Sequence, residues 1–178
     1  MNQLIAIHDK QFKPYLSGQK IAESVKKMAA KMNADLDKAN PLFLVVLNGS
    51  FVFAADLLRE ISCDCEISFV KLSSYAGTET SGKVTELIGL TESVTNRTVV
   101  IVEDIVDSGI TMSRLIDDLK SKKAKEVKLA TLLFKPESFK KDFEIDYVGF
   151  EIPNDFVVGY GMDYDGRGRN LKEIHVLA

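Results

Sequence analysis

Short apolar runs that alternate with helical patterns are the feature that most constrains the fold of this chain. LFLVVL (42–47) and TVVIV (98–102) are too short for buried helices and are typical of strands covered on both faces. In the segments between such runs, apolar residues recur every three or four positions, which predicts helices over 51–61 and 111–122. This alternation predicts an α/β fold, with a mainly parallel, twisted sheet flanked by helices.

The remaining segments extend this pattern toward both ends of the chain. Residues 17–37 are predicted to form an amphipathic helix with Ser17 as its N-cap, and residues 76–83 a loop. Further strands are predicted at 66–75, 84–90, 126–134, 146–152, 156–162 and 173–177. A chain of 178 residues with 46% hydrophobic content can bury a core without disulfides or a structural metal, so we expect a single domain over residues 1–178.

The charge and the reactive side chains of the chain exclude several classes of function. The net charge of -3 argues against a strongly basic surface for nucleic acid. No apolar run approaches the ~20 residues of a membrane span, and the N-terminus lacks a signal-peptide pattern, so we expect a cytoplasmic protein and no membrane partner. Cys63, Cys65, His8 and His175 are too few soft ligands for a zinc site. Acid–base chemistry is therefore expected from carboxylates or lysines.

The stretch VVIVEDIVDSGITM (99–112) places three carboxylates and a glycine where a buried strand ends and a helix begins. DSGIT brings backbone N–H groups and two hydroxyls to the start of the helix, an arrangement that favours a phosphate. Glu103 and Asp104 would repel a phosphate, but carboxylates can bind Mg²⁺ or accept hydrogen bonds from ribose hydroxyls. The expected ligand therefore carries a phosphate, vicinal hydroxyls and a metal ion, and Asp107 is free to act as a general base.

Other interpretations of this stretch explain less of it. The acids could simply cap the helix, with the hydroxyls satisfying its first turn. That interpretation leaves Glu103 and Asp104 at the end of a buried strand without a role. A nucleoside triphosphatase would need G-x-x-x-x-G-K-[ST], and a dinucleotide-binding protein G-x-G-x-x-G; the sequence contains neither.

The stretch 99–112 and several further segments resemble the motifs of a known protein family. VVIVEDIVDSGITM closely resembles the phosphoribosyl-pyrophosphate motif of type I phosphoribosyltransferases: an apolar strand, two acids, two apolar residues and D-[ST]-G-x-T. LNGSFVFAADL resembles the pyrophosphate loop of that family, and KLSSYAGTETSGKV its flexible catalytic loop. FKPE and VGFEIPNDFVVGYGMDY resemble the purine-recognition region of the members that use hypoxanthine or guanine. The resemblance covers roughly residues 42–178, in order.

The resemblance implies a fold and a reaction. The fold would have a core over about residues 40–150 and a small hood built from the N-terminal segment and about 151–178. The reaction would be the Mg²⁺-dependent transfer of 5-phosphoribosyl from 5-phosphoribosyl 1-pyrophosphate to N9 of hypoxanthine, and of guanine, in purine salvage. The products would be the nucleoside monophosphate and pyrophosphate.

The resemblance also implies roles for individual residues. Glu103 and Asp104 would contact the ribose hydroxyls and a metal, and Asp107 would be the acid/base near N7 of the purine. The 5′-phosphate would be bound by the loop Asp107, Ser108, Gly109, Ile110 and Thr111. In the flexible loop, Ser74 and Tyr75 match the pair that closes over the reaction centre.

The remaining implied roles concern the base and the pyrophosphate. Lys135 would read O6 of the base, Phe156 would stack on the purine, and the backbone of Val157 would read the base edge. Asp163, beside the base site, would serve the second Mg²⁺. Pyrophosphate would be bound by Asn48, Gly49 and Arg169, with Arg167 as the nearby competitor for the last role.

One departure and several alternatives remain open at this point. Many members have lysine or arginine at the position of Asn48, and a non-proline cis peptide is common in the family between the positions of Leu47 and Asn48. A transferase for xanthine or a pyrimidine is one alternative, and a nucleotide-sensing, RNA-binding regulator of the same fold is another, which the net charge of -3 disfavours. The sequence does not choose between a homodimer and a homotetramer, nor among hypoxanthine, guanine and xanthine.

Overall fold

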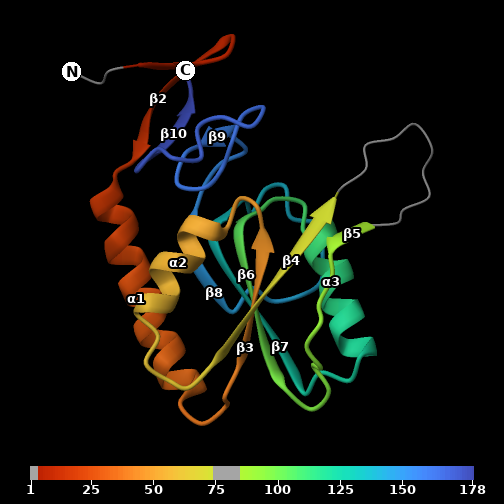
Figure 1. The fold of residues 1–178 in the computed structure, drawn as a ribbon. Helices are drawn as coiled ribbons and strands as arrows, with labels where there is room; N and C mark the ends of the chain where they lie inside the picture. The colour runs from red at the N-terminus through yellow and green to blue at the C-terminus, as the bar shows by residue number, and fades with distance from the viewer. Residues whose placement is uncertain (1–3, 74–84) are drawn as a thin grey trace.

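The computed structural model, which describes residues 4–73 and 85–178, contains a mainly parallel sheet (Figure 1). The strand order is β5-β4-β3-β6-β7-β8; all neighbours pair in parallel except β4 and β5, which are antiparallel. The strands are β3 (Leu42–Leu47), β4 (Glu66–Ser73), β5 (Thr85–Ile88), β6 (Thr98–Val106), β7 (Glu126–Phe134) and β8 (Tyr147–Glu151). The predicted fold class is thereby confirmed.

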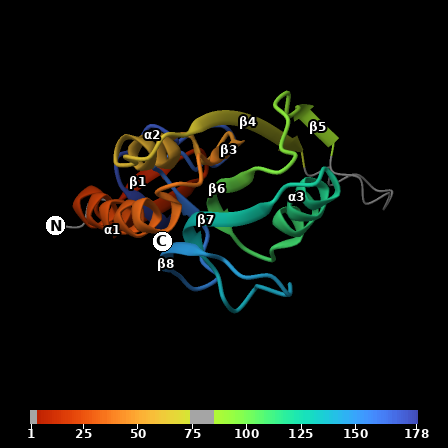
Figure 2. The same ribbon diagram turned by 90° about the horizontal axis from the view of Figure 1, so that it is seen from below.

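Helices cover both faces of this sheet (Figure 2). They are α1 (Gly18–Leu36) and α2 (Phe51–Arg59) on one face and α3 (Ile110–Ser121) on the other. Alternation along β3 explains the arrangement: Phe43 and Val45 pack with α1 and α2. Leu42 and Leu44 pack with α3. Because both faces are buried, LFLVVL is apolar throughout rather than alternating.

A second, antiparallel sheet lies beyond the carboxyl ends of the parallel strands (Figure 1). Its order is β1-β2-β10-β9, and its strands are β1 (Ile5–Ile7), β2 (Lys10–Leu16), β9 (Val157–Val158) and β10 (Ile174–Leu177). Its strands come from the N-terminal and C-terminal segments, which meet where Ala178 N–H donates to the Gln11 carbonyl over 2.9 Å. The sequence patterns predicted no strand before residue 17; β2 pairs on one side with β1 and on the other with β10, about 160 residues further along the chain.

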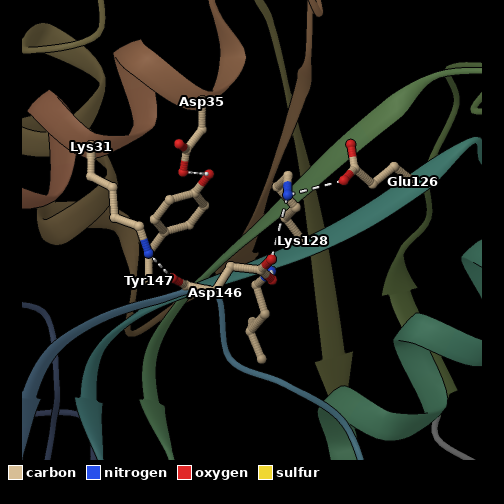
Figure 3. Close-up of polar contacts among 7 residues, drawn as sticks. Lys31, Asp35, Glu126, Lys128, Asp146 and Tyr147 are labelled. Atoms are coloured by element: carbon tan, nitrogen blue, oxygen red, sulfur yellow. Dashed lines mark hydrogen bonds and ion pairs between the residues drawn. The ribbon is translucent and has the colours of Figure 1, made fainter.

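Polar contacts attach α1 to β8, the edge strand of the larger sheet (Figure 3). The Tyr147 hydroxyl donates to the Asp35 carboxylate over 3.1 Å, and Lys31 Nζ donates to the Asp146 carbonyl over 2.9 Å. The Asp146 carboxylate in turn pairs with Lys128 on β7, at 3.5 Å. Because α1 follows β2 directly, these contacts help to hold the small sheet in place over the larger one.

Several element boundaries differ from those predicted. The sequence predicted a strand over 98–102, but β6 continues to Val106, so the two adjacent acids are strand residues. The strand predicted at 156–162 is confined to Val157–Val158, because Gly159, Tyr160 and Gly161 have φ of 101°, 51° and 103°. Ser17 is confirmed as the N-cap of α1. In the part of the chain that the structure describes, none of the helices is long and apolar enough to cross a membrane.

Candidate active site

A cavity of about 550 Å³ lies between the carboxyl ends of the parallel strands and the small sheet. It is lined by Gly49, Leu72, Asp104, Ile105, Asp107, Lys135, Phe156, Val157, Met162, Asp163 and Arg169. Most of these were singled out in the sequence. Leu72, Ile105 and Met162 were missed, because apolar residues in or next to strands carry no signal that distinguishes a cavity wall from a core. The location agrees with the rule that open α/β sheets bind ligands at the carboxyl ends of their strands.

A second cavity, of about 110 Å³, adjoins the first at Ile105 and Asp107. It is lined by Glu103 and by residues 105–112, which run from the end of β6 into the first turn of α3. Gly109, with φ of 76°, is the N-cap of α3, and no side chain in the described part of the chain caps this helix end. The interpretation that the acids merely cap the helix is therefore wrong. The uncapped N–H groups of the first helical turn favour an anion in this cavity.

The two adjacent acids face different cavities. Glu103 lines the small cavity and Asp104 the large one, because successive strand residues point to opposite faces. Burial, and then the neighbouring Asp104, raises the pKa of Glu103 well above its usual value. Burial also raises the pKa of Asp104 to about 6, although its carboxylate accepts a hydrogen bond from the Ile105 N–H over 2.8 Å. Among the described residues, Glu103 Oε2 is buried without a hydrogen-bond partner, which costs free energy because the atom has lost its bonds to water. A ligand that donates a hydrogen bond to this oxygen would remove that cost.

Lys135 and Asp107 come together where β6 and β7 end. Lys135 Nζ lies 3.3 Å from Asp107 Oδ2, and the Lys135 N–H donates to the Val106 carbonyl over 2.9 Å, which continues the pairing of the two strands. The Lys135 side chain is 10% exposed, whereas that of Asp107 is 55% exposed. Lys135 is therefore a buried cation held by one carboxylate, and not a solvated residue at a strand end.

The aromatic wall of the large cavity comes from the small sheet. Phe156 is 43% exposed and lines the cavity, whereas Val157, the first residue of β9, is buried. The Phe156 ring packs against Phe12 and Tyr164, with ring centroids 6.3 and 5.8 Å apart. A phenylalanine with an open side at a cavity is suited to stack on a flat ligand.

A close contact between two glycines brings the small sheet down onto the loop after β3. A Cβ on Gly161 would lie 2.0 Å from the Gly49 carbonyl oxygen, so a side chain at residue 161 would overlap that loop. Arg169 Nη1 donates to the Gly161 carbonyl over 2.8 Å, and its Nη2 pairs with Asp163 at 2.7 Å. Arg167, the predicted competitor, does not line either cavity.

Three predicted residues are not brought to the cavities by the described structure. Asn48 is exposed and lines neither cavity, although the Leu47–Asn48 peptide bond is cis, as is common in the family that the sequence resembles. Ser74 and Tyr75 lie outside the described residues. Within residues 4–73 and 85–178, no three His, Cys, Asp or Glu side chains gather to hold a metal ion. A metal at Asp104 or Asp163 would therefore need oxygens from a ligand as well.

Comparisons with known proteins agree with this geometry. A family model described as "Phosphoribosyl transferase domain" matches residues 12–165. The chain is 43% identical to a hypoxanthine-guanine phosphoribosyltransferase of Bacillus subtilis, over 93% of this chain and 92% of that protein. A crystal structure of a hypoxanthine-guanine phosphoribosyltransferase from Bacillus anthracis is similar with a TM-score of 0.87 and 43% identity, over 93% of this chain and 98% of that one.

Longer relatives also match. The bifunctional protein TilS/HprT of Listeria innocua is 44% identical over 97% of this chain. This chain spans 27% of the length of that relative, so the similarity concerns one part of the bifunctional protein.

Proposed function

The chain belongs to the phosphoribosyltransferase family, and from this premise we propose that it transfers 5-phosphoribosyl from 5-phosphoribosyl 1-pyrophosphate to N9 of hypoxanthine and guanine. The products are the nucleoside monophosphate and pyrophosphate, and the role is purine salvage. One observation carries the proposal: the Asp107–Lys135 pair lies where a loop suited to phosphate adjoins a cavity with an aromatic wall. Similarity to hypoxanthine-guanine phosphoribosyltransferases over most of the chain supports it.

The small cavity binds the 5′-phosphate in this proposal. The N–H groups at the start of α3 and the hydroxyls of Ser108 and Thr111 donate to the phosphate oxygens. Gly109 and Ile110 contribute backbone, and the φ of 76° at Gly109 lets the loop turn closely around the ligand. Glu103, on the side of the small cavity, and Asp104, on the side of the large cavity, accept hydrogen bonds from the ribose hydroxyls.

The purine lies against Phe156, with Val157 reading its edge through the backbone. Lys135 donates to O6 of the base, which a buried cation beside an aromatic wall is suited to do. When Lys135 Nζ turns to O6, it leaves the Asp107 carboxylate free to accept the purine proton as N9 bonds to the ribose. The two members of the ion pair thus take separate roles: Lys135 binds the base and Asp107 accepts its proton.

Arg169 and the backbone of Gly49 bind the pyrophosphate. A guanidinium suits a diphosphate because its planar fork binds oxygens in pairs.

We assign Mg²⁺ to Asp104 and Asp163, which line the same cavity, rather than to Glu103, which lines the other. Few protein carboxylates completed by phosphate oxygens and water are the usual ligand set for this ion. Bound there, Mg²⁺ would offset the negative charge that develops on the pyrophosphate as it leaves. The role of Ser74 and Tyr75 in closing the site stays a prediction.

We further propose that the protein acts in the cytoplasm as a homodimer or homotetramer, a single domain over residues 1–178. Large apolar side chains at the start of α2 and on β4 support self-association: Phe51, Ile67 and Phe69 are 45%, 46% and 47% exposed. The free cysteines Cys63 and Cys65 agree with a reducing compartment. Light scattering after gel filtration would give the number of subunits.

Initial rates with hypoxanthine, guanine and xanthine, side by side, test the proposed reaction. The assay contains 5-phosphoribosyl 1-pyrophosphate and Mg²⁺, and controls omit one or the other. Hypoxanthine should yield inosine monophosphate and guanine should yield guanosine monophosphate. A clear preference for xanthine, or for a pyrimidine added to the series, would replace the proposed substrate. If no base is consumed, the proposed reaction is wrong.

A further inference from the structure

The N-terminal hairpin, which is formed by β1 and β2, contacts the loop 163–169 with three successive side chains. His8 Nε2 lies 3.2 Å from the Asp165 carbonyl oxygen. The Tyr164 hydroxyl donates to Asp9 Oδ1 over 2.7 Å, and Lys10 Nζ lies over the Tyr164 ring, 4.3 Å from its centroid. The N-terminal hairpin is therefore attached to this loop by hydrogen bonds and by a cation–π contact.

Lys10 also contacts the aromatic wall of the large cavity. Its Nζ lies 5.5 Å from the centroid of Phe156, whose ring meets Tyr164 edge to face. Lys10 does not line the cavity, so its ammonium contacts the Phe156 ring from outside the space that a ligand would fill. One cation thus interacts with both rings of the pair.

The loop 163–169, which the N-terminal hairpin contacts, carries two cavity residues at its ends. Asp163 and Arg169 line the cavity and pair with each other at 2.7 Å. Between them the loop packs on the N-terminal hairpin a second time, since a Cβ on Gly168 would lie 3.0 Å from Ile7 Cδ1. The hairpin therefore supports the middle of the loop, while the ends of the loop face the cavity.

We propose that Lys10 is a positioning residue for the purine side of the site, which acts through the rings of Phe156 and Tyr164. It holds the Phe156 ring in place for the base, and with Tyr164 it fixes the loop that carries Asp163 and Arg169. The effect on substrate rests on the proposed function, whereas the effect on the loop does not. Lys10 touches no reacting atom, so its loss should weaken base binding more than it slows the chemical step.

Substitutions at Lys10 test this role. Lys10→Met keeps most of the stem without the charge, Lys10→Arg keeps a cation for the rings, and Lys13→Met removes an exposed lysine from the same strand as a control. A cation–π contact at an exposed site predicts that Lys10→Met raises the KM for hypoxanthine about two- to fivefold, with kcat little changed. Lys10→Arg should restore the KM, and Lys13→Met should leave it unchanged. Adding Lys10→Met to a Phe156→Leu variant should raise the KM no further.

Amide hydrogen exchange of the ligand-free protein gives a readout that does not depend on activity. In Lys10→Met the amides of residues 156–168 should exchange faster than in the wild type, and in Lys13→Met they should not. Unchanged exchange in Lys10→Met overturns the proposal, as does an equal effect of the Lys13→Met control. An equal rise of the KM in the Phe156→Leu background also overturns it. If the wild type consumes no purine, the proposed function fails, and exchange alone decides whether Lys10 positions the loop.

Discussion

Gly161→Ala tests the contact that brings the small sheet onto the loop after β3. The new Cβ would lie 2.0 Å from the Gly49 carbonyl oxygen, whereas ordinary contacts begin at 3.4 Å. One of the two backbones must therefore move by about 1 Å or more, which a close-packed junction resists. Gly166→Ala is a matched control, because Gly166 also has a positive φ, of 79°, but nothing lies within 4 Å of its Cβ position.

The two variants separate backbone strain from overlap. An alanine in the left-handed region costs about 1–2 kcal/mol, and this cost applies to both. Overpacking costs about 1–3 kcal/mol more, and this cost applies to Gly161→Ala alone. Urea unfolding should therefore give a free energy of unfolding about 1–3 kcal/mol lower for Gly161→Ala than for Gly166→Ala.

Steady-state kinetics should also show a larger effect of Gly161→Ala than of Gly166→Ala. Gly161→Ala displaces the carbonyl that accepts a hydrogen bond from Arg169, so it should raise the KM for 5-phosphoribosyl 1-pyrophosphate more than Gly166→Ala does. If Gly161→Ala loses no more stability than Gly166→Ala and its KM is unchanged, the close contact with Gly49 does not set the position of the small sheet.

Three further substitutions test the roles proposed for individual residues. Asp107→Asn should lower kcat about 10²- to 10⁴-fold with a modest change in the KM for 5-phosphoribosyl 1-pyrophosphate, because it removes the proton acceptor and keeps the phosphate loop. Lys135→Ala should mainly raise the KM for the base, measured from initial rates at varied hypoxanthine. If Asp107→Asn and Lys135→Ala each weakened binding of the base and of 5-phosphoribosyl 1-pyrophosphate equally, these roles would be contradicted. Asn48→Lys should change the KM for 5-phosphoribosyl 1-pyrophosphate by less than about twofold, because residue 48 is exposed and lines neither cavity. A larger decrease of this KM, which added salt reverses, would show that a charge at residue 48 reaches the ligand.

Local patterns predicted the larger sheet and one half of the site. LFLVVL and TVVIV indicated buried strands, because a strand covered on both faces must be apolar at every position. The loop Asp107–Thr111 could be predicted as a phosphate site because all of its parts lie within five successive residues. Gly109 occupies the left-handed position that the turn into α3 requires.

The same patterns were wrong where a distant segment decides the outcome. The apolar run 156–162 predicted a strand, but β9 ends after two residues, where Gly159 and Gly161 take positive φ and the chain turns toward the loop after β3. β1 and β2 were not predicted at all. The pairing of β2 with β10 depends on residues near the opposite end of the chain, and no local periodicity records it.

The sequence by itself determined the fold class and the identity of most residues that line the two cavities, including the loop 107–111 to which we assign the phosphate. Only the tertiary structure decided how these residues are divided: Glu103 faces one cavity and Asp104 the other, and Lys135 is paired with Asp107. It also brought Lys10, the first residue of β2, onto Phe156, almost 150 residues away in the chain. The physical reason is that propensity and periodicity act over a few neighbouring residues. Ion pairs and ring contacts form between side chains that meet only after the strands have paired and the small sheet has packed onto the larger one.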